Sequence, residues 1–120
     1  MLFRSESRGF LFAAPVAQAL GASFVPMRKP GKLPRGTVSE RYALEYGTDA
    51  LEVHADAFAG ARGVMVVDDV LATGGTAAAA CRLVERAGGR VALCAFLMEL
   101  SFLRGRASLA QRRIESLIRY

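Results

Sequence analysis

Residues 64–76, Val-Met-Val-Val-Asp-Asp-Val-Leu-Ala-Thr-Gly-Gly-Thr, decide the fold of this chain. They begin with four apolar residues without polar alternation, a pattern typical of a strand buried on both faces of a parallel sheet. Asp68 and Asp69 follow the apolar residues directly. We expect the strand to end at these aspartates, which places both carboxylates at the carboxyl edge of the sheet. Open α/β sheets bind their ligands at that edge.

The loop at residues 72–76 has the composition of a phosphate-binding site. Its two glycines allow backbone N–H groups to converge, its two threonines supply hydroxyl donors, and a helix is expected directly behind it. The pattern differs from the nucleotide P-loop and from the dinucleotide fingerprint. Adjacent carboxylates suit the hydroxyls of a sugar whose 5′-phosphate lies in the loop. The residues assigned to the phosphate site are Ala72, Thr73, Gly74, Gly75 and Thr76.

The segments around this loop predict an α/β fold with an open, mostly parallel sheet flanked by helices. Apolar runs at 23–27 and 91–97 indicate strands, and residues 114–120 are a further candidate strand. Residues 10–20 are apolar and alanine-rich and precede Gly21, which favours a helix, and helical periodicity runs from Thr76 to the glycine pair at 88–89. A strand, a helix and a strand at this spacing form a right-handed parallel crossover.

A loop and a hairpin are predicted between the first helix and the central strand. Residues 29–37 contain two prolines, two glycines and three cations, which favours a mobile loop. Alternation at 42–46 and at 51–54 indicates two strands, with a turn at 47–49. His54 falls on the polar side of the second strand, where a surface position is expected.

Length and composition restrict the class of protein. The chain has 120 residues, 52% of them apolar, so we expect residues 1–120 to form a single domain with its own core. Sixteen Lys or Arg against eleven Asp or Glu give a net charge of +5, which indicates an anionic partner of unspecified kind. Two cysteines exclude a disulfide scaffold and favour reduced thiols in a cytoplasmic protein.

A charge-free stretch near the start invites a different interpretation. Residues 10–27 contain no charged side chain and follow Arg4 and Arg8, as in a secretory signal. Pro15 and Gly21 interrupt the stretch, so we predict a buried helix and a buried strand and expect no membrane partner. Secretion is the minor alternative.

Residues 64–76 resemble the phosphoribosyl-pyrophosphate signature of type I phosphoribosyltransferases. Three further stretches narrow the resemblance to the adenine phosphoribosyltransferases: residues 6–10 (Glu-Ser-Arg-Gly-Phe), 28–34 (Arg-Lys-Pro-Gly-Lys-Leu-Pro) and 44–47 (Leu-Glu-Tyr-Gly). The resemblance runs in order from about Glu6 to Tyr120. It implies the type I phosphoribosyltransferase fold, an enzyme of purine salvage and a homodimer.

These enzymes join adenine to the sugar of phosphoribosyl pyrophosphate and release AMP and pyrophosphate. The leaving group is a polyanion, so its departure needs cations and backbone donors. The resemblance places this role on a pyrophosphate loop and a cationic clamp, formed by Ser7, Arg8, Arg28, Lys29 and Lys32. For the two lysines taken alone, a solvated loop is the alternative.

The resemblance also implies three catalytic carboxylates. Asp68 and Asp69 would hold the ribose hydroxyls and stabilise the oxocarbenium charge of the sugar. Glu45 would hold the proton of the attacking adenine nitrogen, although an ordinary exposed strand glutamate would have the same spacing. Loop residues 34–42 would close over the site. Mg²⁺ would bind through substrate oxygens, so we expect no dedicated metal site in the protein.

The chain departs from the family at its start. Only residues 1–5 precede the Glu-Ser-Arg-Gly position, and Leu2 and Phe3 are too few for a normal buried strand. We therefore expect the N-terminal strand and the base-binding hood to be missing or truncated. The resemblance therefore implies that the half of the site that binds phosphate and ribose is complete. It implies that the half that binds adenine is largely absent.

There are three alternatives to an active adenine phosphoribosyltransferase. They are a non-catalytic regulator that binds phosphoribosyl pyrophosphate, an inactive fragment, and a transferase for another base such as guanine or xanthine. Arg8, Lys32 and Glu45 together favour an enzyme, because a regulator need not keep them. Nucleic acid is not the expected partner, because the basic residues are spread over loop, helix and tail without a reading motif. For the arginines of the tail, a solvated surface is expected.

Overall fold

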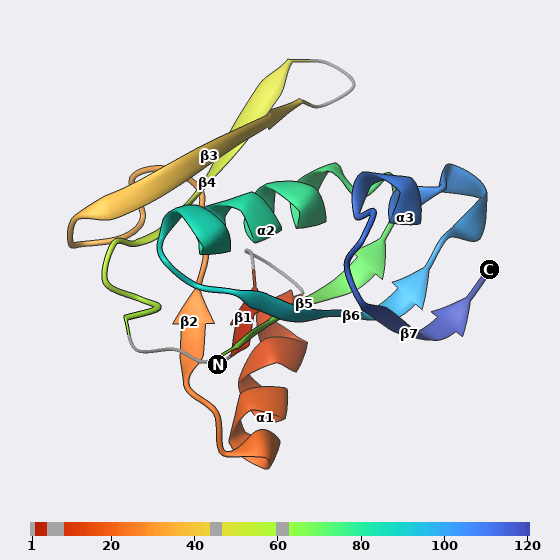
Figure 1. Ribbon diagram of the computed structural model, residues 1–120, viewed down its shortest axis with the longest axis horizontal. Coiled ribbons are helices and arrows are strands. Elements are labelled where there is room, and N and C mark those ends of the chain that lie inside the picture. The colour runs from red at the N-terminus through yellow and green to blue at the C-terminus, as the bar shows by residue number, and fades with distance from the viewer. Residues whose placement is uncertain (1, 5–8, 44–46, 60–62) are drawn as a thin grey trace.

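A five-stranded parallel sheet forms the centre of the molecule in the computed structural model, which describes residues 2–4, 9–43, 47–59 and 63–120 (Figure 1). The order of strands is β2-β1-β5-β6-β7, and every neighbouring pair is parallel. The strands are β1 (Leu2–Arg4), β2 (Phe24–Pro26), β5 (Val64–Leu71), β6 (Val91–Glu99) and β7 (Ile114–Arg119). The central position of β5 places its carboxyl end between neighbours on both sides.

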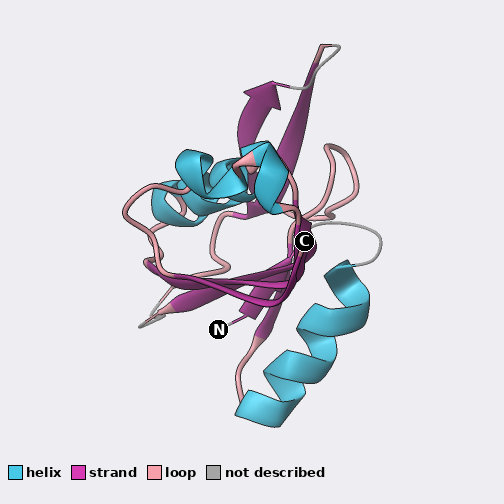
Figure 2. Ribbon diagram, turned by 90° about the vertical axis from the view of Figure 1, so that its right-hand side faces the viewer, coloured by secondary structure: helices cyan, strands magenta, loops and turns pink. Residues whose placement is uncertain are grey.

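Helices cover the two faces of the sheet (Figure 2). Helix α1 (Gly9–Leu20) lies on one face and α2 (Gly75–Arg86) on the other. Val64 and Val66 belong to the core beneath α2, whereas Met65 and Val67 pack with α1. Because successive side chains of a strand point to opposite faces, a strand covered on both sides must be apolar at every position. This arrangement explains the uninterrupted apolar run of β5.

An antiparallel hairpin extends from the α2 side of the sheet (Figure 1). It consists of β3 (Thr37–Ala43) and β4 (Thr48–His54), with Thr37 opposite His54 and Ala43 opposite Thr48. Leu51 and Val53 point into the core beneath α2 and are almost completely buried. The hairpin is therefore packed against the α2 layer at its base.

Two short helices connect β6 with β7. The 3₁₀ helix η1 spans Ser101–Leu103 and α3 spans Gly105–Ser108. Leu109 follows α3 and is 1% exposed within the core cluster of α2. This connection brings the chain back across the carboxyl edge of β5.

The helices and most of the strands lie where the sequence predicts them. α1 ends before Gly21, whose φ of 64° is in the left-handed region that favours glycine. The strands expected at 23–27, 91–97 and 114–120 are present as β2, β6 and β7. Cys81 and Cys94 are both free and fully buried, with their sulfur atoms 3.5 Å apart.

Three predicted boundaries are wrong. β5 does not end at the aspartates, because Val70 pairs with Met98 and Leu71 with Glu99 of β6. The predicted closing loop at 34–42 is a loop only at its start, since Thr37–Ala43 form β3. The predicted turn at 47–49 is shifted, because β4 already begins at Thr48. In each case pairing with a neighbouring strand extends the strand over polar residues. The sequence pattern alone assigns those residues to a loop or turn.

The N-terminal strand is short, in keeping with the expectation of a missing or truncated strand. β1 is only three residues long, and it pairs with β2 and with β5. A short strand suffices here because it has a partner on each side, so its backbone groups are satisfied from two directions.

His54 is not an ordinary surface residue. Its side chain is half-buried, and its Nε2 atom is buried without a hydrogen-bond partner among the described residues. The residue is the last of β4, beside the base of the hairpin.

The packing of β5 leads to a first prediction. Val66 is 1% exposed, so Val66→Ala leaves a cavity and lowers the free energy of unfolding by about 2 kcal/mol. Chemical denaturation measures the loss. Leu117→Ala serves as the control, because Leu117 is 80% exposed and its truncation changes stability by less than about 0.5 kcal/mol. Equal losses in the two variants would contradict the burial of β5 beneath α2.

Candidate functional site

Two adjacent carboxylates lie near the carboxyl end of β5. Asp68 is 8% exposed, and its Oδ1 accepts the N–H of Asp69 at 2.5 Å. Asp69 is half-buried, and its Oδ1 accepts the N–H of Val70 at 2.9 Å. These bonds hold each side chain against its own strand. The pair is thus a fixed acidic feature at the sheet edge where open α/β folds bind ligands.

The loop behind β5 leads directly into α2. Gly74 is the N-cap residue with φ 88°, and no side chain caps the helix. A Cβ atom at Gly74 would lie 2.5 Å from the carbonyl oxygen of Gly105, so both the backbone angle and the space require glycine. Uncapped N–H groups at a helix start, together with the positive end of the helix dipole, suit a phosphate group.

The hairpin reaches this loop through Tyr42, which sequence reasoning did not single out. The side chains of Thr76 and Asp49 lie close enough to the Tyr42 hydroxyl to shift its pKa. Burial and the negative charge of Asp49 raise the pKa of Tyr42. The alternating pattern of β3 predicts a strand, but it contains no signal that one of its side chains contacts the phosphate loop.

Asp49 extends this contact to one of the predicted cations. Lys29 Nζ lies 2.8 Å from Asp49 Oδ2, and Lys29 holds the pKa of Asp49 below its ordinary value. The predicted clamp residue Lys29 is therefore paired with Asp49, and Asp49 and the predicted phosphate residue Thr76 both lie near the Tyr42 hydroxyl. Lys29 and Thr76 are 47 positions apart in the sequence.

The rest of the predicted clamp is also attached to β4. Arg28 forms an isolated antiparallel bridge with Glu52, with backbone distances of 2.9 and 2.7 Å. The N–H of Gly31 donates to the Glu52 carboxylate at 3.0 Å. Lys32 follows in the exposed loop. The cationic segment is thus placed by the hairpin. Ser7, Arg8 and Glu45 lie outside the described residues.

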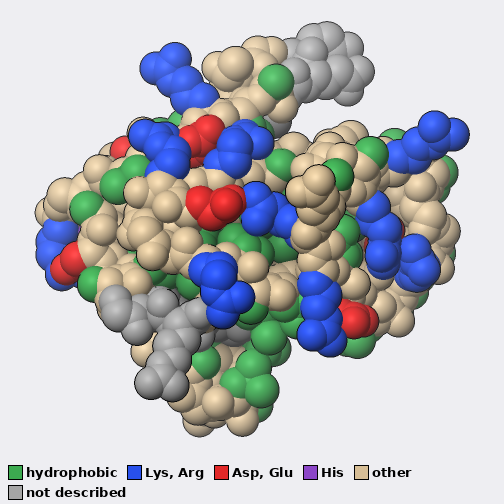
Figure 3. Space-filling view, in the orientation of Figure 1, with side chains coloured by type: hydrophobic (Ala, Val, Ile, Leu, Met, Phe, Trp, Pro, Cys, Tyr) green, Lys and Arg blue, Asp and Glu red, His purple; other side chains and the backbone are tan. Residues whose placement is uncertain are grey.

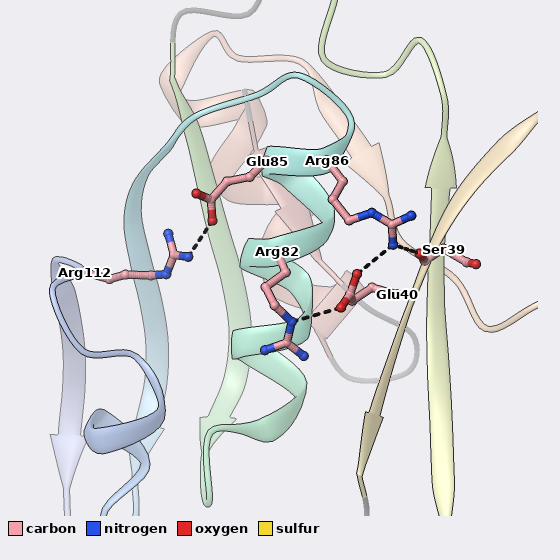
Figure 4. Close-up of polar contacts among 6 residues, drawn as sticks. All are labelled: Ser39, Glu40, Arg82, Glu85, Arg86 and Arg112. Atoms are coloured by element: carbon pink, nitrogen blue, oxygen red, sulfur yellow. Dashed lines mark hydrogen bonds and ion pairs between the residues drawn. The ribbon is translucent and has the colours of Figure 1, made fainter.

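A group of ion pairs attaches the hairpin to α2 (Figure 4). Glu40 accepts Nε of Arg82 at 3.0 Å and Nη1 of Arg86 at 2.7 Å, and Arg86 also donates to the carbonyl of Ser39. Arg86 first, and then Arg82, hold the pKa of Glu40 below its ordinary value. Basic and acidic side chains accordingly gather over α2 and beside the hairpin in Figure 3.

The tail arginines are paired within the protein. Arg112 donates to Glu85 of α2 at 2.5 Å, as Figure 4 also shows. Arg113 lies 3.9 Å from Glu115, and Arg119 lies 3.3 Å from Glu99. Arg113 and Arg119 are exposed, as the sequence predicts, whereas Arg112 is half-buried beside α2.

A protein-held metal ion needs several ligand side chains that converge on one point. Within the described ranges, no group of three or more His, Cys, Asp or Glu side chains converges on one point. Asp68 and Asp69 supply hard oxygen atoms, which suit Mg²⁺ when a substrate and water complete its coordination. No helix of the described chain has the length and apolar character needed to cross a membrane.

Residues 6–113 match the family model of the phosphoribosyl transferase domain. The chain belongs to this family. The adenine phosphoribosyltransferase of Chloroflexus aurantiacus is 58% identical over 115 residues, which cover 96% of this chain and 66% of the relative. The adenine phosphoribosyltransferase of Desulfitobacterium hafniense is 59% identical with the same coverage. The resemblance to adenine phosphoribosyltransferases is confirmed.

Solved structures of the family agree with the sheet described above. The crystal structure of adenine phosphoribosyltransferase from Thermoanaerobacter pseudethanolicus has a TM-score of 0.96 and 55% identity, and the match covers 99% of this chain and 69% of that one. The type I phosphoribosyltransferase fold is therefore confirmed. This family member spans about 66% of the length of the curated relatives named here.

The ion pairs of Glu40 predict that the hairpin loosens in acid. Because its pKa is lowered in the folded state, the stabilisation by Glu40 is complete above its ordinary value of 4.5 and is lost as the pH falls through the lowered value. Glu40→Gln should loosen the hairpin already at pH 7, with several-fold faster amide hydrogen exchange at residues 37–43. The exposed arginines limit the global loss to about 1 kcal/mol or less.

Exchange measured by mass spectrometry from pH 7 down to below the lowered pKa of Glu40, with rates corrected for their intrinsic pH dependence, tests this prediction. Glu115→Gln is the matched control, because Glu115 faces Arg113 at 3.9 Å on an exposed surface. Equal exchange of residues 37–43 in Glu40→Gln and the parent chain would contradict it.

Proposed function

We propose that the chain transfers the phosphoribosyl group of 5-phosphoribosyl 1-pyrophosphate to adenine, giving AMP and pyrophosphate in purine salvage. The observation that carries this proposal is the arrangement of Asp68, Asp69 and the loop 72–76 within a chain 58% identical to an adenine phosphoribosyltransferase. A regulator without activity is not favoured, because the relatives named above are enzymes of this kind.

The loop and the acidic pair divide the work of binding the sugar phosphate. The uncapped start of α2 and the hydroxyl groups of Thr73 and Thr76 bind the 5′-phosphate. Asp68 and Asp69 accept hydrogen bonds from the ribose hydroxyls and lower the energy of the positive charge that develops on the sugar. Because both carboxylates are fixed against β5, little reorganisation is needed when the charge appears.

The leaving pyrophosphate requires positive charge on its own side. We assign this role to Ser7, Arg8, Arg28, Lys29 and Lys32, as the family resemblance implies. Mg²⁺ fits the site when held mainly by substrate oxygens, where it supplies charge neutralisation. Glu45 is proposed to hold the proton of the attacking adenine nitrogen. A solved adenine phosphoribosyltransferase from Saccharomyces cerevisiae, 44% identical with a TM-score of 0.89 over 94% of this chain and 64% of that one, is complexed with adenine.

Tyr42 has a part in this scheme, since its hydroxyl lies near the side chain of Thr76. We infer that a phosphate bound by the Thr76 hydroxyl alters the contact between hairpin and loop. The chain is proposed to act as one domain of residues 1–120, in the cytoplasm and as a homodimer.

The acidic pair gives a direct test of the proposed function. An assay coupled to AMP and pyrophosphate, with adenine, phosphoribosyl pyrophosphate and Mg²⁺, should lose activity at least about 100-fold in the Asp68→Asn, Asp69→Asn variant. The control is Asp56→Asn, an exposed aspartate paired with Arg35 at 3.4 Å, which should leave activity unchanged.

Ligand-induced stabilisation separates the remaining outcomes. Phosphoribosyl pyrophosphate should raise the Tm of the parent chain and not that of the double variant. A parent chain that shows this shift without turnover has a working phosphoribosyl site and lacks the complete reaction. A parent chain with neither turnover nor a Tm shift would contradict the proposal.

A further inference from the structure

The connection between β6 and β7 touches the back of the phosphate loop. Ser108 of α3 donates its hydroxyl to the carbonyl oxygen of Thr73 at 2.9 Å. One residue after β6, the N–H of Leu100 donates to the carbonyl of Leu71 at 3.0 Å. The loop that leaves β5 is therefore held at its first residues and again at Thr73 by one segment.

The backbones of α3 and of the loop after β5 approach so closely that there is no room for a side chain at either contact glycine. A Cβ atom at Gly105 would lie 2.4 Å from the carbonyl oxygen of Ala72 and 2.8 Å from a methyl carbon of Leu71. On the loop side of the same contact, a Cβ atom at Gly74 would lie 2.8 Å from Cβ of Ser108. Arg104 precedes this contact with φ 53°, an unfavourable angle for a residue other than glycine. The chain thus accepts local strain where α3 meets the loop.

A buried carboxylate attaches α3 to the sheet. Glu99, the last residue of β6, is 3% exposed and accepts two bonds from Arg106, at 2.8 and 2.9 Å. Ser116 of β7 donates to the same carboxylate at 2.6 Å, and Arg119 lies 3.3 Å from it. Arg106 is the main cause of a Glu99 pKa lowered to about 2, so the pair stays ionised at neutral pH. α3 is therefore fixed relative to both β6 and β7.

The bond from Ser108 has a consequence for the phosphate site. The peptide between Thr73 and Gly74 is planar and trans, so its N–H points away from its carbonyl oxygen. Because Ser108 fixes that oxygen on the α3 side, the N–H of Gly74 is directed to the opposite side of the loop. A donor held in this way needs no reorientation when a phosphate binds.

We propose that α3 is the support that holds the phosphate loop in its binding conformation, with Ser108 as a positioning residue for the N–H of Gly74. The inference rests on the proposed function, because it takes residues 72–76 as the seat of the 5′-phosphate. Ser108 acts through the loop. It is distinct from the residues that contact the substrate.

The test uses two ligands that differ in where they bind. Ribose 5-phosphate carries the monoester that the loop is proposed to bind, whereas pyrophosphate is assigned to the cationic segment. Calorimetry on the full chain with Ser108→Ala should show the Kd for ribose 5-phosphate raised about fivefold, as expected for one lost hydrogen bond. The Kd for pyrophosphate should change less than about twofold on the same scale. Ser108→Thr keeps the hydroxyl and should restore most of the affinity.

A second measurement follows the loop without any ligand. Amide hydrogen exchange at residues 74–76 should rise in Ser108→Ala and return towards the parent rate in Ser108→Thr. Ser101→Ala is the matched control, because Ser101 is exposed in the same connection and its side chain has no hydrogen bond among those described. The Tm of each variant is recorded to detect general loss of structure.

The outcomes separate this inference from the proposed function. If the parent chain binds ribose 5-phosphate and Ser108→Ala changes neither its Kd nor the exchange, the support role is wrong and the function stands. A parallel rise of both Kd values together with a lower Tm would show a merely structural residue and would also overturn the role. If the parent chain binds neither ribose 5-phosphate nor phosphoribosyl pyrophosphate, both the function and the support role fail.

Discussion

The position of β5, buried on both faces and paired on both edges, is the constraint on which the rest of the structure depends. Its side chains enter the core beneath α2 and the smaller cluster beneath α1. β1 and β6 occupy its two edges. The acidic pair and the glycine loop lie at the carboxyl end of this strand. The residues proposed to bind the sugar phosphate are therefore positioned by a rigid strand.

The loop after β5 is limited by close backbone contacts. Gly74 and Gly105 approach each other so closely that neither has room for a Cβ atom. The Glu99 carboxylate is buried and hydrogen-bonded to Arg106 and Ser116. These bonds hold α3, and with it Gly105, against the loop. On the other side, Tyr42 of the hairpin lies near Thr76. The phosphate loop thus lies between a fixed support and a hairpin held by partly exposed ion pairs, which are weaker in water.

This difference in strength follows from the exposure of the two carboxylates. Glu40 is held by Arg82 and Arg86, whose side chains are 46% and 56% exposed. Glu99 is held by Arg106 in a position where the carboxylate is 3% exposed. Arg106 itself is 41% exposed, so the two sets of pairs differ mainly in their carboxylates, because Glu40 is 18% exposed. A pair with a more exposed carboxylate contributes less, so the hairpin is held more weakly than α3.

Much of this was legible in the sequence, for identifiable reasons. Apolar composition indicated α1 and β6, and an ordered motif over residues 64–76 indicated the acidic pair and a candidate phosphate loop. The boundaries that differ, at Thr37, Thr48 and Leu71, all depend on pairing with another strand, which is β4 or β3 within the hairpin and β6 for Leu71. Local pattern carries no information about such a partner.

The sequence by itself determined the fold class and indicated the loop as a candidate phosphate site, because both follow from short-range order: apolar continuity, adjacent carboxylates, glycines before a helix. Only the tertiary structure decided which residues meet the loop from outside. Tyr42 reaches Thr76 across 34 positions and Ser108 reaches Thr73 across 35. Contacts at that separation are set by the packing of the hairpin and of α3 against the sheet, and packing is a property of the folded chain alone.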